Sequence, residues 1–440
     1  MEWYAALALL IGTLIVLMLL GVPVVFAFFL VNIVGAWVFM RGDVGLTQFM
    51  RNTVDSLQSF ALLPVPLFIF MGEMMFHSGV AARAIDAIDK LISQLPGRLS
   101  LVAVCGGTIF ASLSGSTISN TAMLGSTLLP EMYRRGYHPS VSIGPIVAVG
   151  GIAMLIPPSA LAVLLGSLAQ IGIAELLVAS ILPALILAAL FFAYIVARCT
   201  LRPDLAPAYD QHAMSWRERV MPFVKYVLPL LSIFVVVVGS IVSGVATPTE
   251  SAALGAVATV AATAAYRKLS RRNLLVAINK TMRITVMTLF IIAGSVTFSQ
   301  LMAFSGASGG LSALVLGSEL RPLTVLLGML GVLLILGCFM DQVSMMLITV
   351  PLYMPVVSNL GLNEIWFGVL MLMILEISLA TPPFGMLLFV IKGVSPGTSM
   401  REIIVSVAPF VIMALVVVAL LIAVPGITLI VPEMIARRGG

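Results

Sequence analysis

The segment SLSGSTISNTAMLGSTLLPEMYRRGY, residues 112–137, decides how this chain folds. Its polar run at 114–120 interrupts a long apolar region, and MDQVSMMLITVPLYMP at 340–355 repeats the arrangement in the second half of the chain. The apolar arms beside 114–120 hold about 13 residues each, so at 1.5 Å per residue one arm reaches roughly 20 Å. Because the hydrocarbon core of a bilayer is ~30 Å thick, residues 99–135 predict a re-entrant hairpin rather than two crossings.

Composition places the chain in a lipid bilayer. Of its 440 residues, 61% are apolar and 9% are charged, and the mean hydropathy is +1.17. A soluble domain carries roughly a quarter charged residues. The net charge of +5 lies in the loops and indicates membrane topology rather than a nucleic-acid surface. We expect Cys105, Cys199 and Cys338 to behave as buried small apolar residues.

The pattern of apolar residues predicts the helices. Apolar runs predict helices near 4–20, 23–40, 64–80 and 173–198. Amphipathic segments are expected near 46–60 and 82–95.

An internal repeat divides the chain. Pro23 and Pro248, Gly106 and Gly331, and Pro130 and Pro355 recur at a common spacing of 225 residues. Since proline and glycine occur where the backbone bends, matched bends predict two halves with a common fold. We expect a first repeat at 1–200 with a hairpin at 99–135 and a broken helix at 140–169, a cytoplasmic linker at 201–225, and a second repeat at 226–440 with a hairpin at 323–358 and a broken helix at 364–391.

The predicted crossings invert one half relative to the other. Each half is expected to cross the membrane five times, and an odd number of crossings turns the second half over. With the linker in the cytoplasm, most of the 23 Lys and Arg residues fall on the cytoplasmic side, as the positive-inside rule requires. Those on the other side are Arg41, Arg51, Arg321, Arg437 and Arg438. The predicted fold class is therefore an all-α membrane protein with an inverted structural repeat, two re-entrant hairpins and two broken helices.

Four polar clusters at the breaks are candidates for binding a substrate and ions. Broken helices in a membrane line cavities, and their free ends bind anions and sodium. The candidates are Ser114, Gly115, Ser116, Thr117, Ser119 and Asn120 at the first hairpin, Pro157, Pro158 and Ser159 at the first break, Asp341, Gln342 and Ser344 at the second hairpin, and Thr381, Pro382, Pro383 and Gly385 at the second break. None is Lys or Arg, so hydroxyls, amides, backbone groups and bound sodium would hold a carboxylate. The alternative that these small residues only allow close helix packing stays open.

Four acidic residues differ in their predicted roles. Asp341 stands where Ser116 stands in the other half and is the strongest candidate for a charged sodium ligand, against the alternative of a loop aspartate at a wetter depth. For Glu73 and Glu376, a functional role and simple pairing both stay open. Glu250, which follows TPT, is predicted to be a first-turn acid of a helix.

The motifs of enzymes are missing from the sequence. There is no GxxxxGK[ST] phosphate loop, and His77, His138 and His212 lack the spacing of metal ligands. An intramembrane hydrolase built from Ser116 with His77 or His138 is a weak alternative. We therefore expect no enzymatic activity.

Further motifs carry a resemblance to a known family. They are PLFIFMGEMMFHSG at 66–79, IPPSALAVLLG at 156–166, ATPTESAALGAV at 246–257 and LATPPFGMLLFV at 379–390. Together with the two hairpin segments, this ordered set resembles the large membrane subunit of the tripartite ATP-independent periplasmic (TRAP) transporters over nearly the whole length. Family members commonly have an aliphatic residue at the position of Phe384 and a glycine at that of Ser378, so substrate size and local sodium geometry are expected to differ.

The resemblance implies a secondary active transporter subunit of the bacterial inner membrane, with several membrane passes. It implies import of a small organic anion, a carboxylate such as a C4-dicarboxylate, sugar acid or keto acid, with sodium as coupling ion and no cofactor. The implied partners are a periplasmic substrate-binding protein and a small four-helix membrane subunit on a separate chain. Sodium would bind at Ser114, Ser116, Asn120, Asp341 and Thr381, and the hairpins and broken helices would move as an elevator. A stand-alone sodium-coupled dicarboxylate carrier and a channel are the alternatives.

Overall fold

The computed structural model describes residues 2–58, 60–92, 94–114, 117–207, 215–317, 320–383 and 385–439, and among them every regular element is a helix. The first half consists of α1 (Trp3–Leu19), α2 (Val24–Phe39), α3 (Asp43–Leu57), η1 (Phe60–Leu62), α4 (Pro64–His77), α5 (Val80–Leu91), α6 (Arg98–Ser114), α7 (Thr117–Arg134), α8 (Pro139–Gly150), α9 (Ala160–Ala169), α10 (Ile173–Ala179), α11 (Ile181–Leu201) and η2 (Pro203–Leu205). The second half consists of α12 (Trp216–Pro222), η3 (Phe223–Val227), α13 (Leu228–Val242), α14 (Pro248–Ala265), α15 (Arg271–Phe304), α16 (Ala307–Gly317), α17 (Pro322–Leu336), α18 (Gln342–Asn359), α19 (Glu364–Leu379), α20 (Met386–Val394), α21 (Met400–Ala423) and α22 (Gly426–Gly439).

Helix starts recur between the halves. α7 begins at Thr117 and α18 at Gln342, 225 residues later, and α8 and α19 begin with the same spacing at Pro139 and Glu364. The peptide bonds Pro157-Pro158 and Pro382-Pro383 are both cis. Each half thus contains a helical hairpin followed by a helix that is broken at a Pro-Pro pair.

The arms of the first hairpin are longer than predicted. α6 has 17 residues and α7 has 18, which corresponds to about 26 and 27 Å at 1.5 Å per residue. The prediction of about 13 residues is wrong because apolar counting stops at the first polar side chain, whereas α7 already begins at Thr117. A helix accepts hydroxyl and amide side chains without losing its backbone hydrogen bonds, so it continues into the polar run.

A capping motif in the sequence explains where α14 begins. Thr247 caps α14: its hydroxyl accepts a hydrogen bond from Glu250 N (3.3 Å), and the Glu250 carboxylate accepts one from Thr247 N (2.8 Å). This capping box satisfies two free N–H groups of the first turn. The predicted first-turn role of Glu250 is therefore confirmed.

Four helical runs in the described residues are long and apolar enough to cross a membrane: Ile173–Leu201, Trp216–Val242, Arg271–Phe304 and Met400–Ala423. The run from Trp216 starts inside the predicted linker at 201–225. The segment 271–283 is the first part of the 34-residue helix α15. In the first half, by contrast, α3 and α4 are separate helices with η1 between them, and α4 begins at Pro64.

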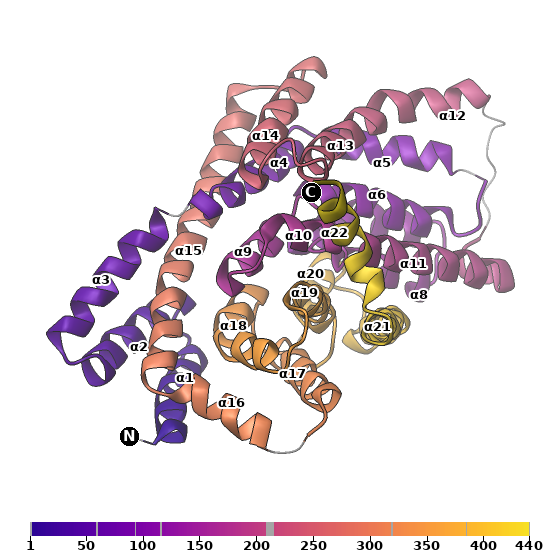
Figure 1. Cartoon of the computed structure of the whole chain (residues 1–440). Coiled ribbons are helices and arrows are strands. Elements are labelled where there is room, and N and C mark those ends of the chain that lie inside the picture. The colour runs from indigo at the N-terminus through magenta and orange to yellow at the C-terminus, as the bar shows by residue number, and fades with distance from the viewer. Residues whose placement is uncertain are drawn as a thin grey trace.

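The helices form two neighbouring groups (Figure 1). On one side α15 packs against α2, α3 and α4, and α14 packs against α4 and α13. On the other side α8 contacts α6, α7 and α21, while α19 contacts α17, α18 and α21. Nearly all residues of α8 and α19 are buried, as expected for helices that are apolar on every face. The two broken helices therefore form the centre of the second group.

The cysteines behave as apolar residues. Cys199 and Cys338 are buried, Cys105 is half-buried, and all three are free thiols. The prediction of buried small residues is confirmed for Cys199 and Cys338.

Candidate functional site

The tip of the first hairpin is held by contacts of α7. Thr117, the first residue of α7, is buried and donates a 2.7 Å hydrogen bond from Oγ1 to Glu376 Oε1 of α19. Asn120 Nδ2 donates to Gly107 O of α6 at 3.3 Å, and Ser119 is half-buried. Gly115, Ser116 and the side chain of Ser114 lie outside the described residues. The described part of this tip thus contacts both its own hairpin and the other half of the chain.

The first break packs directly against that tip. A methyl group added to Gly150, the last residue of α8, would lie 2.3 Å from Thr121 Oγ1, so the two backbones approach as closely as glycine permits. Pro157 and Pro158 are buried. Ser159 caps α9 by accepting a hydrogen bond from Ala162 N at 3.2 Å.

The tip of the second hairpin is organised by Asp341. Asp341 Oδ2 accepts hydrogen bonds from the backbone N–H groups of Val343 (3.0 Å) and Ser344 (3.2 Å), and Oδ1 accepts from the Ser344 hydroxyl. Asp341 is therefore the N-cap of α18, a role that uses both of its oxygens. Gln342 Nε2 lies 3.9 Å from Met154 Sδ in the first break. This contact joins the second tip to the first half.

The second break closes against the second hairpin. Thr381 Oγ1 donates to Ile377 O at 2.7 Å. Cys338 Sγ lies 3.7 Å from Thr381 O and 3.5 Å from Pro382 O. Pro382 and Pro383 are exposed, whereas Gly385 is buried at a place where a methyl group would meet Leu379 O at 2.7 Å. Phe384 lies outside the described residues.

The sequence left the role of Glu376 open, and the structure gives this residue a central position. It lies on α19 with 2% of its surface exposed. Besides Thr117, the side chain of Gln342 and the backbone of Met154 lie at its carboxyl group, but no donor reaches Oε2 in hydrogen-bonding geometry. One carboxyl group thus meets both hairpin tips and the first break. The sequence indicates a special role for Glu376 only in that it is a single acidic residue within the apolar run LMLMILEISLA.

Glu73, the other acid of an apolar helix, has ordinary partners. His77 Nε2 lies 3.2 Å from its Oε2 and Lys280 Nζ lies 3.9 Å from the same atom. These residues belong to α4 and α15. For Glu73, pairing is the arrangement that the structure shows.

A cavity of about 450 Å³ opens onto the second tip. Residues 337–341 line one side of it, Ile15, Met18 and residues 21–24 from the end of α1 to the start of α2 line another, and Met386 and Phe389 of α20 line the rest. Its volume falls in the range of small-molecule sites. Asp341 is the charged residue in its wall.

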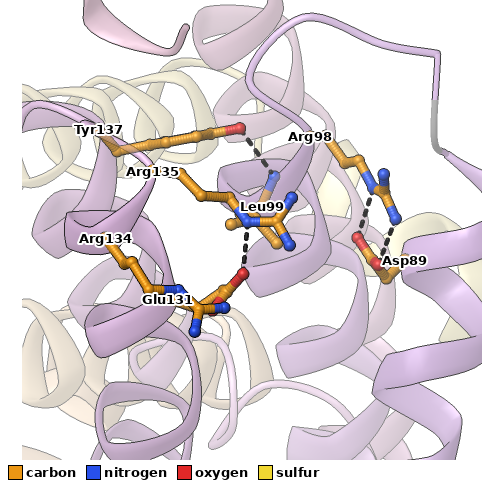
Figure 2. Close-up of polar contacts among 7 residues, drawn as sticks. All are labelled: Asp89, Arg98, Leu99, Glu131, Arg134, Arg135 and Tyr137. Carbon is orange, nitrogen blue, oxygen red and sulfur yellow. Dashed lines mark hydrogen bonds and ion pairs between the residues drawn. The ribbon is translucent and has the colours of Figure 1, made fainter. Parts of the chain in front are cut away.

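The outer end of the first hairpin carries a separate polar cluster (Figure 2). Arg98, at the start of α6, forms two hydrogen bonds with Asp89 of α5, and its Nε lies 2.5 Å from Oδ1. The Tyr137 hydroxyl accepts a hydrogen bond from Leu99 N at 3.5 Å. Glu131 of α7 pairs with Arg134 at the end of α7 and with Arg135 just after it. The Arg98–Asp89 contact joins α6 to α5, and the Tyr137 contact joins the start of α6 to the segment that follows α7.

Comparison with known families identifies the family to which the chain belongs. Residues 11–427 match the family described as "Tripartite ATP-independent periplasmic transporter, DctM component". The chain belongs to the DctM family. The predicted family and the predicted all-α membrane transporter fold are confirmed.

Individual relatives of this DctM-family chain align over almost their full length. The C4-dicarboxylate TRAP transporter large permease protein DctM of Pseudomonas aeruginosa is 30% identical over 405 residues, 90% of this chain and 93% of that protein. The ectoine/5-hydroxyectoine TRAP transporter large permease protein UehC of Ruegeria pomeroyi is 30% identical over 427 residues, 96% of this chain and 97% of that protein. The chain is thus a multi-pass inner-membrane transporter subunit and not an enzyme.

Solved structures share the fold at low sequence identity. The YdaH transporter of Alcanivorax borkumensis superposes with a TM-score of 0.59 at 15% identity, over 86% of this chain and 88% of that one. Neisseria gonorrhoeae MtrF gives a TM-score of 0.58, also at 15% identity, over 88% and 84% of the two chains. At this identity the likeness concerns the fold alone.

Proposed function

We propose that this DctM-family chain is the large permease subunit of a TRAP transporter that imports a small organic anion, a carboxylate, by sodium-coupled secondary active transport. The observation that carries the proposal is the pattern of helix ends at the tips and breaks. Four helices begin there, namely α7, α9, α18 and α20, and four end there, namely α6, α8, α17 and α19. The N-terminal ends attract a carboxylate and the C-terminal carbonyls attract sodium.

The chemistry of the candidate residues fits this assignment. The tips and breaks offer hydroxyl, amide and backbone groups, and the predicted clusters contain no Lys or Arg. We assign sodium to Ser114, Ser116, Asn120, Asp341 and Thr381, as the sequence suggests. The cavity beside Asp341 is the route by which the solute reaches the second tip.

The repeated elements support an elevator as the mode of movement. Hairpins and broken helices at a 225-residue spacing support an inverted repeat. On this proposal they move together as an elevator past the group formed by α1–α4 and α13–α15. Glu376 keeps the two tips together during that movement.

The proposed partners are a periplasmic substrate-binding protein and a small four-helix membrane subunit. The family description, tripartite and periplasmic, supports the first. The isethionate TRAP transporter permease protein DctMQ of Oleidesulfovibrio alaskensis supports the second, because this chain covers 66% of its length. On this proposal the small subunit is a separate chain.

Uptake by proteoliposomes tests the proposal. The chain and its small subunit are reconstituted, the cognate binding protein and labelled solute are added outside, and an inward sodium gradient is compared with a choline gradient. We expect uptake that requires both sodium and the binding protein. Uptake of free solute without the binding protein would instead show a stand-alone carrier. A flux that does not saturate with solute would show a channel.

A further inference from the structure

Three basic side chains line one open cavity between α5 and α12. The cavity has a volume of about 700 Å³, and its walls hold Lys90 from α5, Arg217 from α12 and Lys225 from η3. α5 contacts both α12 and η3, and Figure 1 shows α5 and α12 side by side. Among the described residues, none of the three basic side chains forms an ion pair.

The acidic residues near this cavity do not balance the three positive charges. Glu218 lines the cavity, and its Oε2 accepts hydrogen bonds from Ser215 N (2.8 Å) and Ser215 Oγ (2.9 Å) in the capping box of α12. Asp86 lies one helical turn before Lys90 on α5, outside ion-pair distance. Asp89 is engaged in the cluster of Figure 2. A positive potential therefore remains in the cavity, and it attracts anions.

Aromatic contacts fix the position of Lys225. Its Nζ lies 5.5 Å from the centre of the Tyr226 ring, and Arg83 Cζ lies 5.7 Å from the same centre. The ring of Tyr266 packs 5.7 Å from that of Tyr226, and its hydroxyl donates a 2.5 Å hydrogen bond to Lys225 O. Cations are attracted to the face of an aromatic ring. Since Tyr226 lines the cavity, it brings Arg83 to the edge as a fourth positive charge.

The cavity lies where the membrane-crossing run leaves the hydrocarbon core. The run Trp216–Val242 has 27 residues, which at 1.5 Å per residue is about 40 Å, roughly 10 Å more than the core requires. The part from Lys225 to Val242 already spans about 26 Å. With Val242 at one edge of the core, Lys225 lies near the other edge and Arg217 lies beyond it. The basic side chains are therefore at the level of the lipid headgroups.

An exposed apolar stripe continues from the cavity along the same helical run. Met221 lines the cavity, and Val224, Leu228 and Val235 follow at intervals of three, four and seven residues, which places all four on one helix face. They are 45% to 62% exposed. In a bilayer such a face contacts acyl chains. The basic cavity and the acyl-chain surface are thus continuous.

We propose that the cavity between α5 and α12 binds the phosphate headgroup of an anionic phospholipid, whose acyl chains lie along the stripe from Met221 to Val235. Lysine and arginine are the side chains that bind phosphate, and basic pockets beside membrane helices hold anionic headgroups. The lipid connects the amphipathic helix α5, which packs on the hairpin arm α6, to the start of the crossing run. The inference rests on the membrane location of the chain and not on the proposed solute or coupling ion.

Thermal unfolding of the purified full chain in a neutral detergent tests this binding. The melting temperature Tm is followed while phosphatidylglycerol, or phosphatidylcholine with the same acyl chains, is added, since a ligand of the folded state raises Tm. We expect phosphatidylglycerol to act at the lower concentration. The triple variant Lys90→Gln, Arg217→Gln and Lys225→Gln should need on the order of tenfold more phosphatidylglycerol or beyond, because each basic side chain near an anionic surface contributes about fivefold to affinity.

Three exposed arginines on other helices provide the matched control. Arg272→Gln, Arg321→Gln and Arg401→Gln together remove the same charge and should keep the parental response. The site is overturned if both lipids act equally on the parent, if the triple variant responds like the parent, or if the control responds like the triple variant. If the triple variant does not fold, the exposed Arg217 decides alone: Arg217→Gln should shift the phosphatidylglycerol response by about fivefold.

Inorganic phosphate separates a lipid site from a site for a free anion. Sodium phosphate should leave the Tm of the parent as it is in NaCl of equal ionic strength, because phosphate alone makes no contact with the apolar stripe. If sodium phosphate raises Tm as much as phosphatidylglycerol does, and the triple variant loses that rise, the cavity binds a soluble anion and the lipid assignment is wrong.

Discussion

Thr117 Oγ1 donates a 2.7 Å hydrogen bond to Glu376 Oε1 across a sequence separation of 259 residues. Thr117 opens the second arm of the first hairpin, and Glu376 lies near the end of the intact part of the second broken helix. The Gln342 side chain and the Met154 backbone lie at the same carboxyl group. A shift of either hairpin tip therefore changes the surroundings of the other through one side chain.

Thr117→Val should reduce solute uptake and lower Tm. Valine has nearly the same shape but no hydroxyl, so Glu376 would lose its donor. Leaving a buried acceptor without a partner costs about 1–3 kcal/mol. Uptake by proteoliposomes and Tm of the purified protein measure the two effects.

Thr127→Val is the matched control for that change. Thr127 lies on the same helix, is exposed, and bonds locally to Met123 O. Its replacement should change stability by less than about 0.5 kcal/mol. Equal uptake by Thr117→Val and the parent would show that the bond between the halves has no part in transport.

Asp341 can be tested for two roles at once. Asp341→Ala removes the N-cap of α18 and should cost about 0.5–2 kcal/mol of stability, whereas Asp341→Asn keeps a good cap. If Asp341 also binds sodium, the asparagine variant should fold normally but need more sodium for half-maximal uptake. Sodium-dependent uptake and Tm of both variants separate these outcomes. Parental sodium dependence of Asp341→Asn would leave Asp341 as a cap alone.

The sequence predicted the hairpins and breaks because their signals are local. Pro-Pro pairs and polar runs interrupt apolar helices wherever they occur, and their 225-residue spacing is visible without a structure. The length of α7 was missed because apolar counting ends at Thr117, where the helix begins. Glu376 was undervalued for another reason: its partners Thr117, Met154 and Gln342 come from three distant segments, which no local pattern brings together. The cap made by Asp341, by contrast, is a local motif that the sequence already contains.

Arg98→Met should destabilise the protein through the cluster of Figure 2. The Arg98 side chain is 10% exposed and that of Asp89 is 28% exposed, so the lost pair is partly shielded from water. Removing one partner of a fully buried pair costs several kcal/mol. Because Asp89 keeps some contact with water, about 1–3 kcal/mol is expected, measured as a fall in Tm.

Two further variants show whether the pair itself is responsible. The double variant Asp89→Leu with Arg98→Met removes both charges and should recover part of the loss. Arg134→Met breaks the pair with Glu131 at a side chain that is 76% exposed, and such surface pairs contribute about 0–1 kcal/mol. A Tm loss in Arg134→Met as large as in Arg98→Met would contradict the importance of burial.

Gly337→Ala should disturb the second hairpin where it meets α19. A methyl group on Gly337 would lie 1.9 Å from Ser378 Oγ and 2.2 Å from Ser378 Cβ, far inside contact distance. The φ angle of Gly337 is −67°, so alanine meets no backbone strain and the steric clash alone decides the outcome. Overpacking of this kind costs about 1–3 kcal/mol. We expect a lower Tm and reduced uptake, since the tip that carries Asp341 must move.

Ser378→Gly should rescue most of the loss in the Gly337→Ala variant, because it removes the two nearest atoms and leaves only the flexible end of Met345, 3.0 Å from the new methyl group. The exchange moves one Cβ carbon from α19 to the hairpin and removes one hydroxyl group. Gly331→Ala provides the control on the same helix, since a methyl group there has no atom within 4 Å, and alanine favours the helix. Its Tm should equal or exceed that of the parent. If the double variant stays as unstable as Gly337→Ala, contact with Ser378 is not what requires glycine at the second tip.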